Sequence, residues 1–311
     1  MTLFLGIDIG GTKIASGLVT DAGVVVRRED VPTPAREGGP RVLEAAIALA
    51  RSLGEMAGET VQGVGIGTGG QVDADRGMIV SATELLPGWA GIGVQAAFEN
   101  ALRLPSFVDN DVNALAMGEA RFGAAQNARS VVFLALGTGV GGALLLEGRL
   151  HRGVHWSGGE FGHILLTMDE NARRDAGGHR GTLEAYAAGP GLVQTWRELT
   201  GDTRSPMTGQ TIAAEAARAP DGPAAQAVTR TGEYLGFGLV SLANALDPEL
   251  IVIGGGLAAL GDALLDPARH ILQTHALHGP ANCPVVPASL GPDASLIGAA
   301  SLIMPEHPHH A

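Results

Sequence analysis

Cysteine is nearly absent from the chain, because Cys283 is the only one. A single thiol cannot form an intramolecular disulfide, so the composition favours a reducing compartment, and we expect the cytoplasm. Long apolar runs are missing too, since no stretch reaches the roughly 18 apolar residues of a membrane-spanning helix. The apolar start of the chain follows no basic region and is interrupted by Asp8, so we expect neither a signal peptide nor a membrane partner.

Basic residues are also scarce, and Lys13 is the only lysine. Lys and Arg number 20 against 32 Asp and Glu, which gives a net charge of −12 at pH 7. This balance argues against a general nucleic-acid binder, although a small anionic nucleotide needs only a local site. The length of 311 residues allows one large or two moderate domains with ample core.

The first motif spans residues 6–13 and is typical of the tip of a hairpin between two apolar strands. Gly10 and Gly11 predict a tight turn, because glycine reaches positive φ without steric cost. Backbone N–H groups, the neighbouring threonine and Lys13 can surround phosphate oxygens, and Asp8 can hold a hydrated Mg²⁺. An ordinary glycine hairpin with an exposed lysine is the alternative interpretation.

The same pattern recurs about half a chain later. Residues 131–136 predict a buried strand, 137–142 a glycine-rich tip and 143–146 a returning strand. A third glycine run, at 254–256, follows another apolar strand. Two such units predict two related α/β domains, unless the two glycine hairpins agree by coincidence. None of the three runs matches a P-loop or a complete Rossmann fingerprint.

The polar residues 109–111 lie between a predicted short strand and a predicted helix. Asp111 is expected at the helix N-terminus, where its ionised form is favoured and where it can deprotonate an attacking hydroxyl. Asn110 can hydrogen-bond a polar substrate both as donor and as acceptor. An ordinary helix cap is the alternative, because Asp and Asn are common caps.

A second polar set consists of Glu160, His163 and Glu184. Glycines around the first two leave their side chains accessible, and carboxylates with an imidazole suit the hydroxyl groups of a sugar. A surface loop and a metal site are the alternatives, but a structural zinc site would need cysteine partners that are missing here. No serine-hydrolase elbow is present either.

Five motifs in this order resemble the ROK family of bacterial sugar kinases, within the actin/hexokinase-like ATPase fold, over nearly the whole chain. They are residues 8–13, 109–114, 137–142, 159–163 with 183–184, and 247–256. The resemblance implies ATP-dependent phosphorylation of a hexose at its 6-hydroxyl, and we expect the hexose to be glucose. It also implies that Asp111 is the catalytic base. The sugar-binding positions that it implies are Asn110, Glu160, His163 and Glu184. The positions that it implies for ATP and for Mg²⁺, which Asp8 would hold indirectly, are Asp8, Gly10, Gly11, Thr12, Lys13, Thr138, Gly139, Gly255 and Gly256.

The family fold implies two RNase H-like α/β domains, each with a mixed sheet, and an interdomain cleft. We place the small domain at residues 1–118, with a C-terminal helix at about 294–311 returning to it, and the large domain at 119–293. The resemblance also implies a homodimer. Alternative substrates are N-acetylmannosamine and N-acetylglucosamine. A sugar-responsive regulator without a DNA-binding domain is a remote alternative, disfavoured by the negative charge.

One departure from the family pattern concerns zinc. Many members carry three cysteines in one loop, and here Asp175, Gly177 and Thr182 stand at those positions. Because structural zinc sites usually take four ligands, largely Cys and His, we expect no zinc. The loop then needs another anchor, for which Arg174 or Arg180 paired with a carboxylate are the candidates.

Overall fold

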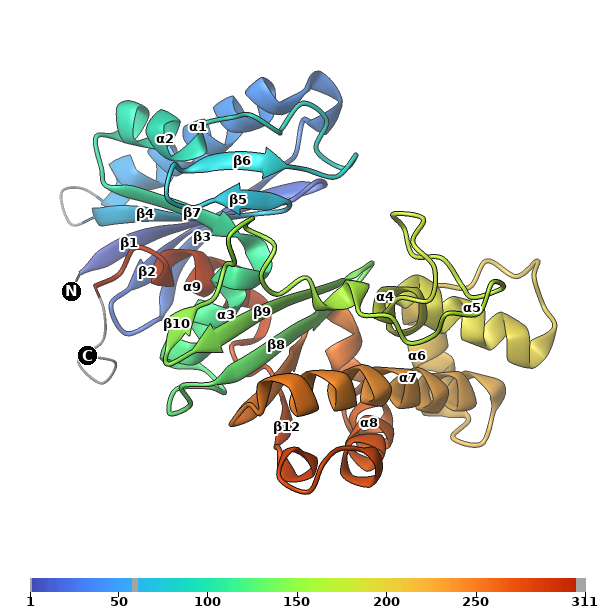
Figure 1. Ribbon diagram of the computed structural model, residues 1–311. Helices are drawn as coiled ribbons and strands as arrows, with labels where there is room; N and C mark the ends of the chain where they lie inside the picture. Colours follow the sequence, from blue (N-terminus) through green and yellow to red (C-terminus); the bar gives the residue numbers. More distant parts are fainter. Residues whose placement is uncertain (1, 58–60, 306–311) are drawn as a thin grey trace. The chain divides into compact units, whose positions relative to one another are not determined.

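The computed structural model describes residues 2–57 and 61–305 and contains two compact units (Figure 1). Unit 1 comprises Met1–Asn127, Arg152–Gly158 and Ser289–Ala311, and unit 2 comprises Ala128–His151 and Gly159–Ala288. None of the described helices is both long enough and apolar enough to cross a membrane.

Unit 1 is built on a five-stranded mixed sheet in the order β3-β2-β1-β4-β7. The first three strands pair antiparallel, whereas β4 runs parallel to β1, and β7 runs parallel to β4. The strands are β1 (Leu3–Ile9), β2 (Lys13–Thr20), β3 (Val25–Pro32), β4 (Val61–Thr68) and β7 (Ser106–Asn110). Nearly every residue of β1 is buried, as expected for a central strand that is covered on both faces.

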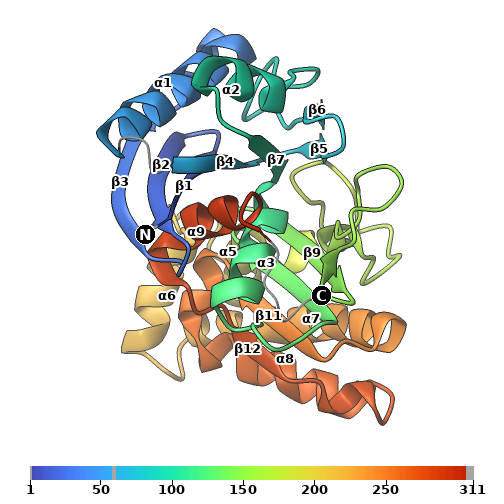
Figure 2. The same cartoon turned by 90° about the vertical axis from the view of Figure 1, so that its left-hand side faces the viewer.

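Helices cover both faces of this sheet, with α1 and α2 on one face and α3 and α9 on the other (Figure 2). Their bounds are α1 (Gly39–Ala57), α2 (Val94–Leu102), α3 (Asp111–Phe122) and α9 (Ala294–Ser301). Phe4 and Val19 from the sheet pack with Ile297 of α9 in a cluster separate from the main core of the unit. The C-terminal helix therefore completes unit 1.

Unit 2 contains a second five-stranded sheet, in the order β10-β9-β8-β11-β12. Its strands are β8 (Val131–Leu136), β9 (Val140–Leu146), β10 (Arg149–Leu150), β11 (Leu250–Gly254) and β12 (Val285–Pro287). The first three pair antiparallel, β11 is parallel to β8, and β12 is parallel to β11. Both units thus join three antiparallel strands to two parallel ones, which confirms the predicted fold class of two α/β units with mixed sheets.

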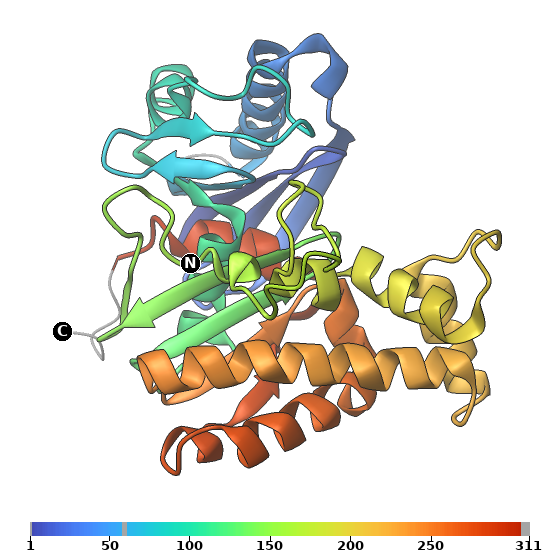
Figure 3. The same ribbon diagram turned by 45° about the vertical axis from the view of Figure 1, so that its right-hand side comes forward.

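The helices of unit 2 enclose its core. They are α4 (Leu183–Ala187), α5 (Gly189–Thr200), α6 (Gly209–Arg218), α7 (Pro223–Leu246) and α8 (Asp262–His275). The long helix α7 lies beside α8 (Figure 3). Leu235 and Leu239 of α7 and Leu264 of α8 are completely buried in the same cluster, so the apolar surface of α7 forms core.

Some boundaries differ from the sequence-based expectations. The predicted division between residues 118 and 119 falls inside α3, which belongs entirely to unit 1, and the domain assignment itself stays a prediction. Helix α9 ends at Ser301, and residues 306–311 of the predicted C-terminal helix lie outside the described residues. The sequence does not predict the small sheet of β5 (Gln71–Asp73) and β6 (Met78–Ser81), because such short strands carry little alternation.

Candidate functional site

The tip of the β1–β2 hairpin in unit 1 carries the first motif. The Gly10 N–H donates to the Lys13 carbonyl across the tip, at 3.0 Å. Neither Gly10 nor Gly11 is among the described residues with positive φ, so the sequence-based reason for these glycines is wrong. Instead, a Cβ at Gly11 would lie 2.8 Å from the Cβ of Leu85. Glycine is needed here because another loop approaches closely.

Strand β7 leads directly into α3 at Asn110 and Asp111, as the sequence predicts. Asn110 is the N-cap, because its Oδ1 accepts from the N–H groups of Val112 at 2.9 Å and Asn113 at 3.2 Å. Its Nδ2 donates to the Gly70 carbonyl at 3.0 Å. The cap interpretation therefore holds for Asn110, and its side chain also lowers the pKa of Asp111 through a hydrogen bond.

Two carboxylates of unit 1 are poorly solvated and influence each other. Burial, followed by the charge of Asp8, raises the pKa of Asp111 to about 6. Burial also raises the pKa of Asp8, although a hydrogen bond with Ser295 and the charge of Lys13 oppose the shift. A carboxylate with a pKa near 6 can accept a proton at neutral pH, and two such groups together favour a cation.

The backbone before α3 is anchored by an ion pair that sequence reasoning missed. The Asp109 side chain is 1% exposed, and its Oδ2 accepts from Nε of Arg152 at 2.7 Å. Its Oδ1 accepts from Nδ2 of Asn113 at 2.9 Å. No motif singles out Arg152, and the only signal was that a buried Asp needs a cationic or polar partner. The pair fixes the turn that presents Asp111.

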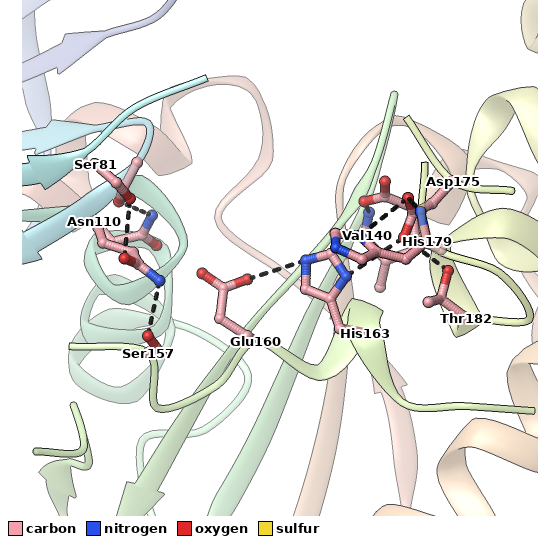
Figure 4. A network of polar contacts seen from close by, with 12 residues as sticks. Ser81, Asn110, Val140, Ser157, Glu160, His163, Asp175, His179 and Thr182 are labelled. Carbon is pink, nitrogen blue, oxygen red and sulfur yellow. Dashed lines mark hydrogen bonds and ion pairs between the residues drawn. The ribbon is translucent and has the colours of Figure 1, made fainter. Parts of the chain in front are cut away.

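A second contact holds the segment Arg152–Gly158 within unit 1. Gln71 of β5 accepts from the Ser81 hydroxyl at 2.9 Å and donates to the Ser157 hydroxyl at 2.7 Å (Figure 4). The segment is therefore fastened to unit 1 near both of its ends, although its neighbours in sequence belong to unit 2.

In unit 2, the two glycine-rich tips follow β8 and β11. Because these strands are parallel neighbours, both tips lie at the same edge of the sheet. The Gly137 N–H donates to the Gly139 carbonyl at 2.9 Å and closes the first tip, which leaves the Thr138 side chain exposed. After β11, Gly255 has a φ of 83° and Gly256 begins a short 3-10 helix. The predicted nucleotide residues of unit 2 thus share one edge.

Glu184 joins the predicted sugar set to one of these tips. It lies in the first turn of α4, and its Oε2 accepts from the Val140 N–H at 2.9 Å. A Cβ at Gly139 would lie only 2.5 Å from this oxygen, so the glycine allows the carboxylate to reach the backbone. Since the protein uses one carboxylate oxygen in this way, the other is left to a ligand.

Glu160 and His163 lie at the two ends of a single 3-10 turn. Their side chains are about half exposed, at 45% and 46%, and Oε2 of Glu160 lies 4.0 Å from Nε2 of His163. The other ring nitrogen of His163, Nδ1, lies 3.4 Å from Oδ2 of Asp175 (Figure 4). The imidazole is therefore placed between two carboxylates, one accessible and one buried.

The buried carboxylate is Asp175, whose side chain is 0% exposed. Oδ1 accepts from the His179 N–H at 2.9 Å, and Oδ2 accepts from the Thr182 hydroxyl at 3.0 Å. Nδ1 of His179 also lies 3.4 Å from Oδ1. Burial alone would raise the pKa of Asp175, but these hydrogen bonds and the two imidazoles hold it below its ordinary value. Two hydrogen-bond donors and two imidazole nitrogens therefore lie beside this carboxylate.

Comparison with known proteins supplies the family. A sequence profile of the ROK family matches residues 4–306. The chain belongs to the ROK family. The glucokinase of Halalkalibacterium halodurans is 34% identical over 315 residues, covering 96% of this chain and 94% of that protein.

Two crystal structures agree with this assignment. A ROK hexokinase from Thermus thermophilus matches with a TM-score of 0.80 and 36% identity, over 97% of each chain. A ROK family glucokinase from Streptomyces griseus in complex with glucose and AMPPNP matches with a TM-score of 0.80 and 34% identity, over 96% of this chain and 98% of the other. The ROK fold therefore extends over nearly the whole chain.

Within this ROK chain, the loop that carries the zinc cysteines of other members does not fit zinc in the same way. Gly177 has no ligand atom, and Thr182 gives its hydroxyl proton to Asp175. Single atoms of His163, Asp175 and His179 do lie within 4.8 Å of one another. However, the carboxylate among them already accepts from two protein donors.

The arginine anchor of this loop also differs from the sequence-based expectation. Arg174 donates to the Gly178 carbonyl rather than to a carboxylate. The carboxylate partner belongs to the preceding residue, because Arg173 donates to Glu198 at 2.6 Å. The same guanidinium lies over the Tyr186 ring, 4.8 Å from its centroid. The sequence thus suggested the correct type of anchor at the wrong arginine.

Proposed function

We propose that the chain is an ATP-dependent glucokinase that transfers the γ-phosphoryl group of ATP to the 6-hydroxyl of glucose. The observation that supports this most directly is Asp111, a poorly solvated carboxylate at the start of α3 with a pKa raised to about 6. The chain belongs to the ROK family, and the relatives that match it over most of both chains include glucokinases.

Asp111 acts as the general base. The 6-hydroxyl oxygen of glucose forms a bond to the γ-phosphorus of ATP, the bond from that phosphorus to the β,γ-bridging oxygen breaks, and ADP leaves. The hydroxyl proton passes to the Asp111 carboxylate. Because phosphoryl transfer has a loose transition state, the alignment of the hydroxyl by Asp111 contributes along with proton acceptance.

The phosphates of ATP bind at the glycine tips. In unit 1 the tip offers the Gly11 N–H with Thr12 and Lys13, and Gly10 closes the tip through its bond to the Lys13 carbonyl; in unit 2 the tip offers Thr138 and Gly139. The pair Asp8 and Asp111 suits Mg²⁺, since a cation offsets the cost of burying both charges and the repulsion by Asp8 that raises the pKa of Asp111. Asp8 would hold the ion through water, and the ion would neutralise charge on the phosphates.

The end of β11 receives the adenosine. Gly255 and Gly256 leave the backbone bare at this edge of the unit 2 sheet, beside the tip with Thr138 and Gly139. One nucleotide can therefore contact both tips, because they follow the neighbouring strands β8 and β11.

The hexose is bound by the Asn110 side chain, by Glu160 and His163, and by the carboxylate oxygen of Glu184 that does not accept from Val140. These groups offer both donors and acceptors, as a sugar requires. Because Glu184 also holds the Val140 N–H, sugar binding is linked to the phosphate tip of unit 2.

The proposal also covers location, oligomeric state, partners and zinc. The enzyme works in the cytoplasm, which the single cysteine favours. It acts as a homodimer, without nucleic acid or membrane partners and without zinc. Light scattering of the purified protein tests the dimer, and a monomeric mass would contradict it.

A coupled assay of ADP release tests the function. Glucose, mannose, N-acetylglucosamine and N-acetylmannosamine are compared at saturating MgATP. Glucose should give the highest kcat/KM, by about tenfold or more over the N-acetyl sugars. A preference for an N-acetylhexosamine would replace the substrate and keep the kinase. Absence of sugar-dependent ADP release with all four sugars would overturn the proposed function.

A further inference from the structure

The loop between Leu165 and Thr182 is closed in two places. Leu165 and Thr182 form a bridge at its base, and Arg174 and Arg180 form a second bridge nearer its tip. Asp175 ties the two levels together, because its side chain accepts from the Thr182 hydroxyl and its own N–H donates to the His179 carbonyl at 2.9 Å. The carboxylate thus lies where the two levels of the loop meet.

The polarity of this cluster is opposite to that of a metal site. A metal site places acceptor atoms around a cation, whereas here donors are arranged around an anion. The anion is the Asp175 carboxylate, and the donors are the Thr182 hydroxyl and the His179 N–H. The imidazole nitrogens of His163 and His179 both lie 3.4 Å from its oxygens.

Gly177 shows how the loop accommodates this arrangement. A Cβ at Gly177 would lie 3.0 Å from Nδ1 of His179 and 3.4 Å from Oδ1 of Asp175. The His179 ring therefore occupies the space into which a side chain at position 177 would point. A side chain there would make close contact with the ring and ordinary contact with the carboxylate, so glycine at this position leaves the His179 ring beside Asp175.

We propose that the Asp175 carboxylate replaces the metal of this loop and positions His163, so that Nδ1 of the ring carries its proton toward Asp175 and Nε2 is presented as an acceptor to the sugar. The proposal rests on the proposed function for the identity of the ligand. Asp175 is a positioning residue, because it contacts His163 and not the sugar. Fixing the partner of one ring nitrogen fixes the role of the other.

Asp175→Asn tests this, since it keeps the shape of the side chain and removes its charge. Glu170→Gln is the matched control, because it removes a carboxylate from the same loop at an exposed position. Long-range proton–nitrogen NMR of histidine-labelled protein at about pH 8 reads the tautomer of each neutral imidazole. His163, assigned with a His163→Gln variant, should be the Nδ1–H tautomer in the parent and in Glu170→Gln, and should lose that preference in Asp175→Asn.

Kinetics provide the second measurement. Asp175→Asn should raise the KM for glucose by about tenfold and leave kcat and the KM for ATP within about twofold. A purely structural role would change all three constants together. If Asp175→Asn does not fold, Thr182→Val removes one donor from the carboxylate and should shift the tautomer in the same direction by a smaller amount. The glucose KM of this variant is not compared, because Thr182 also caps the helix that carries Glu184.

Metal analysis provides the third. Protein purified without a histidine tag should contain less than about a tenth of a zinc ion per chain, and a chelator should leave its melting temperature unchanged. Stoichiometric zinc, or a lower melting temperature after chelation, would overturn the proposal. An unchanged His163 tautomer in a folded Asp175→Asn variant would overturn it too. The NMR and metal results do not depend on kinase activity, so a failure of the proposed function is recognised separately.

Discussion

Asp111 in unit 1 is partly buried and Asp175 in unit 2 is buried, and their pKa values shift in opposite directions. Hydrogen bonds from the backbone at Val112 and Asp111 and from the Asn110 side chain lower the pKa of Asp111, but burial and the charge of Asp8 outweigh them. The Asp175 side chain has two protein donors and two imidazoles close by. Both carboxylates accept hydrogen bonds, so the neighbouring charged groups, an aspartate in one case and two imidazoles in the other, separate the base from the anchor.

Asp111 and Asp175 therefore have different roles, the first as a base and the second as an anchor of its loop. Asp111 must be able to take a proton, which a raised pKa allows near neutral pH. Asp175 must stay ionised, because its charge attracts the donors that order the loop. Four predictions test this contrast, beginning with the largest expected effect.

Asp111→Asn would break the comparison most directly. It keeps the shape of the side chain and removes the base, so kcat with glucose should fall by about 10²–10⁴-fold. Steady-state ADP release measures it, with Asp75→Asn as the control because Asp75 is an exposed aspartate of the same unit. A kcat within about threefold of the parent would be incompatible with Asp111 as the base.

Substitution of Glu160 and of Glu184 should affect the KM values for glucose and ATP differently. Glu160→Gln should raise the KM for glucose by about tenfold and leave the KM for ATP nearly unchanged. Glu184→Ala should raise both KM values, because Glu184 also accepts from Val140 at the glycine tip. Initial rates measured over a full range of glucose and of ATP concentrations give both KM values for each variant. Identical patterns in the two variants would remove the proposed link between the sugar and the phosphate tip.

The pH dependence of the parent enzyme should report Asp111. Because only the ionised carboxylate accepts a proton, kcat/KM for glucose should be half-maximal near the pKa of about 6. Below that pH, it should fall by about tenfold for each pH unit. The profile of Asp175→Asn should keep the same midpoint, since Asp175 titrates well below this range. A midpoint near 4 in the parent would contradict the raised pKa.

The smallest expected effect is on stability. The folded pKa of Asp111, about 6, exceeds its ordinary value of 3.8, so ionisation of this group destabilises the fold above about pH 6. Asp111→Asn should therefore be more stable than the parent at pH 8, by up to about 3 kcal/mol, and the difference should disappear as the pH falls from 6 to 4.

Asp175→Asn should show the opposite sign. The lowered pKa of Asp175 means that its charge stabilises the fold above its ordinary pKa, and that this contribution is lost as the pH falls through the lower folded value. The variant should therefore be less stable than the parent at neutral pH. Urea unfolding at several pH values gives the free energy of unfolding of both variants. If both substitutions stabilise the protein at pH 8, the two aspartates do not differ as proposed.

The sequence by itself determined the local features. Apolar runs that stop at glycine-rich tips predict both hairpins, and residues 109–111 predict a strand end followed by a helix start at Asp111. These features depend on neighbouring residues, which the chain order already places together. The same local motifs, in their order, also identify the ROK family.

Only the tertiary structure decided which distant groups meet. It brings Arg152 to Asp109, Leu85 to Gly11, and Glu184 to the backbone at Val140. It also turns three cysteine replacements into a cluster centred on the Asp175 carboxylate. Such contacts follow from how loops and strands pack, and a pKa shift follows in turn from those contacts. For this reason the sequence located the aspartates, and the fold determined which one is a base and which one an anchor.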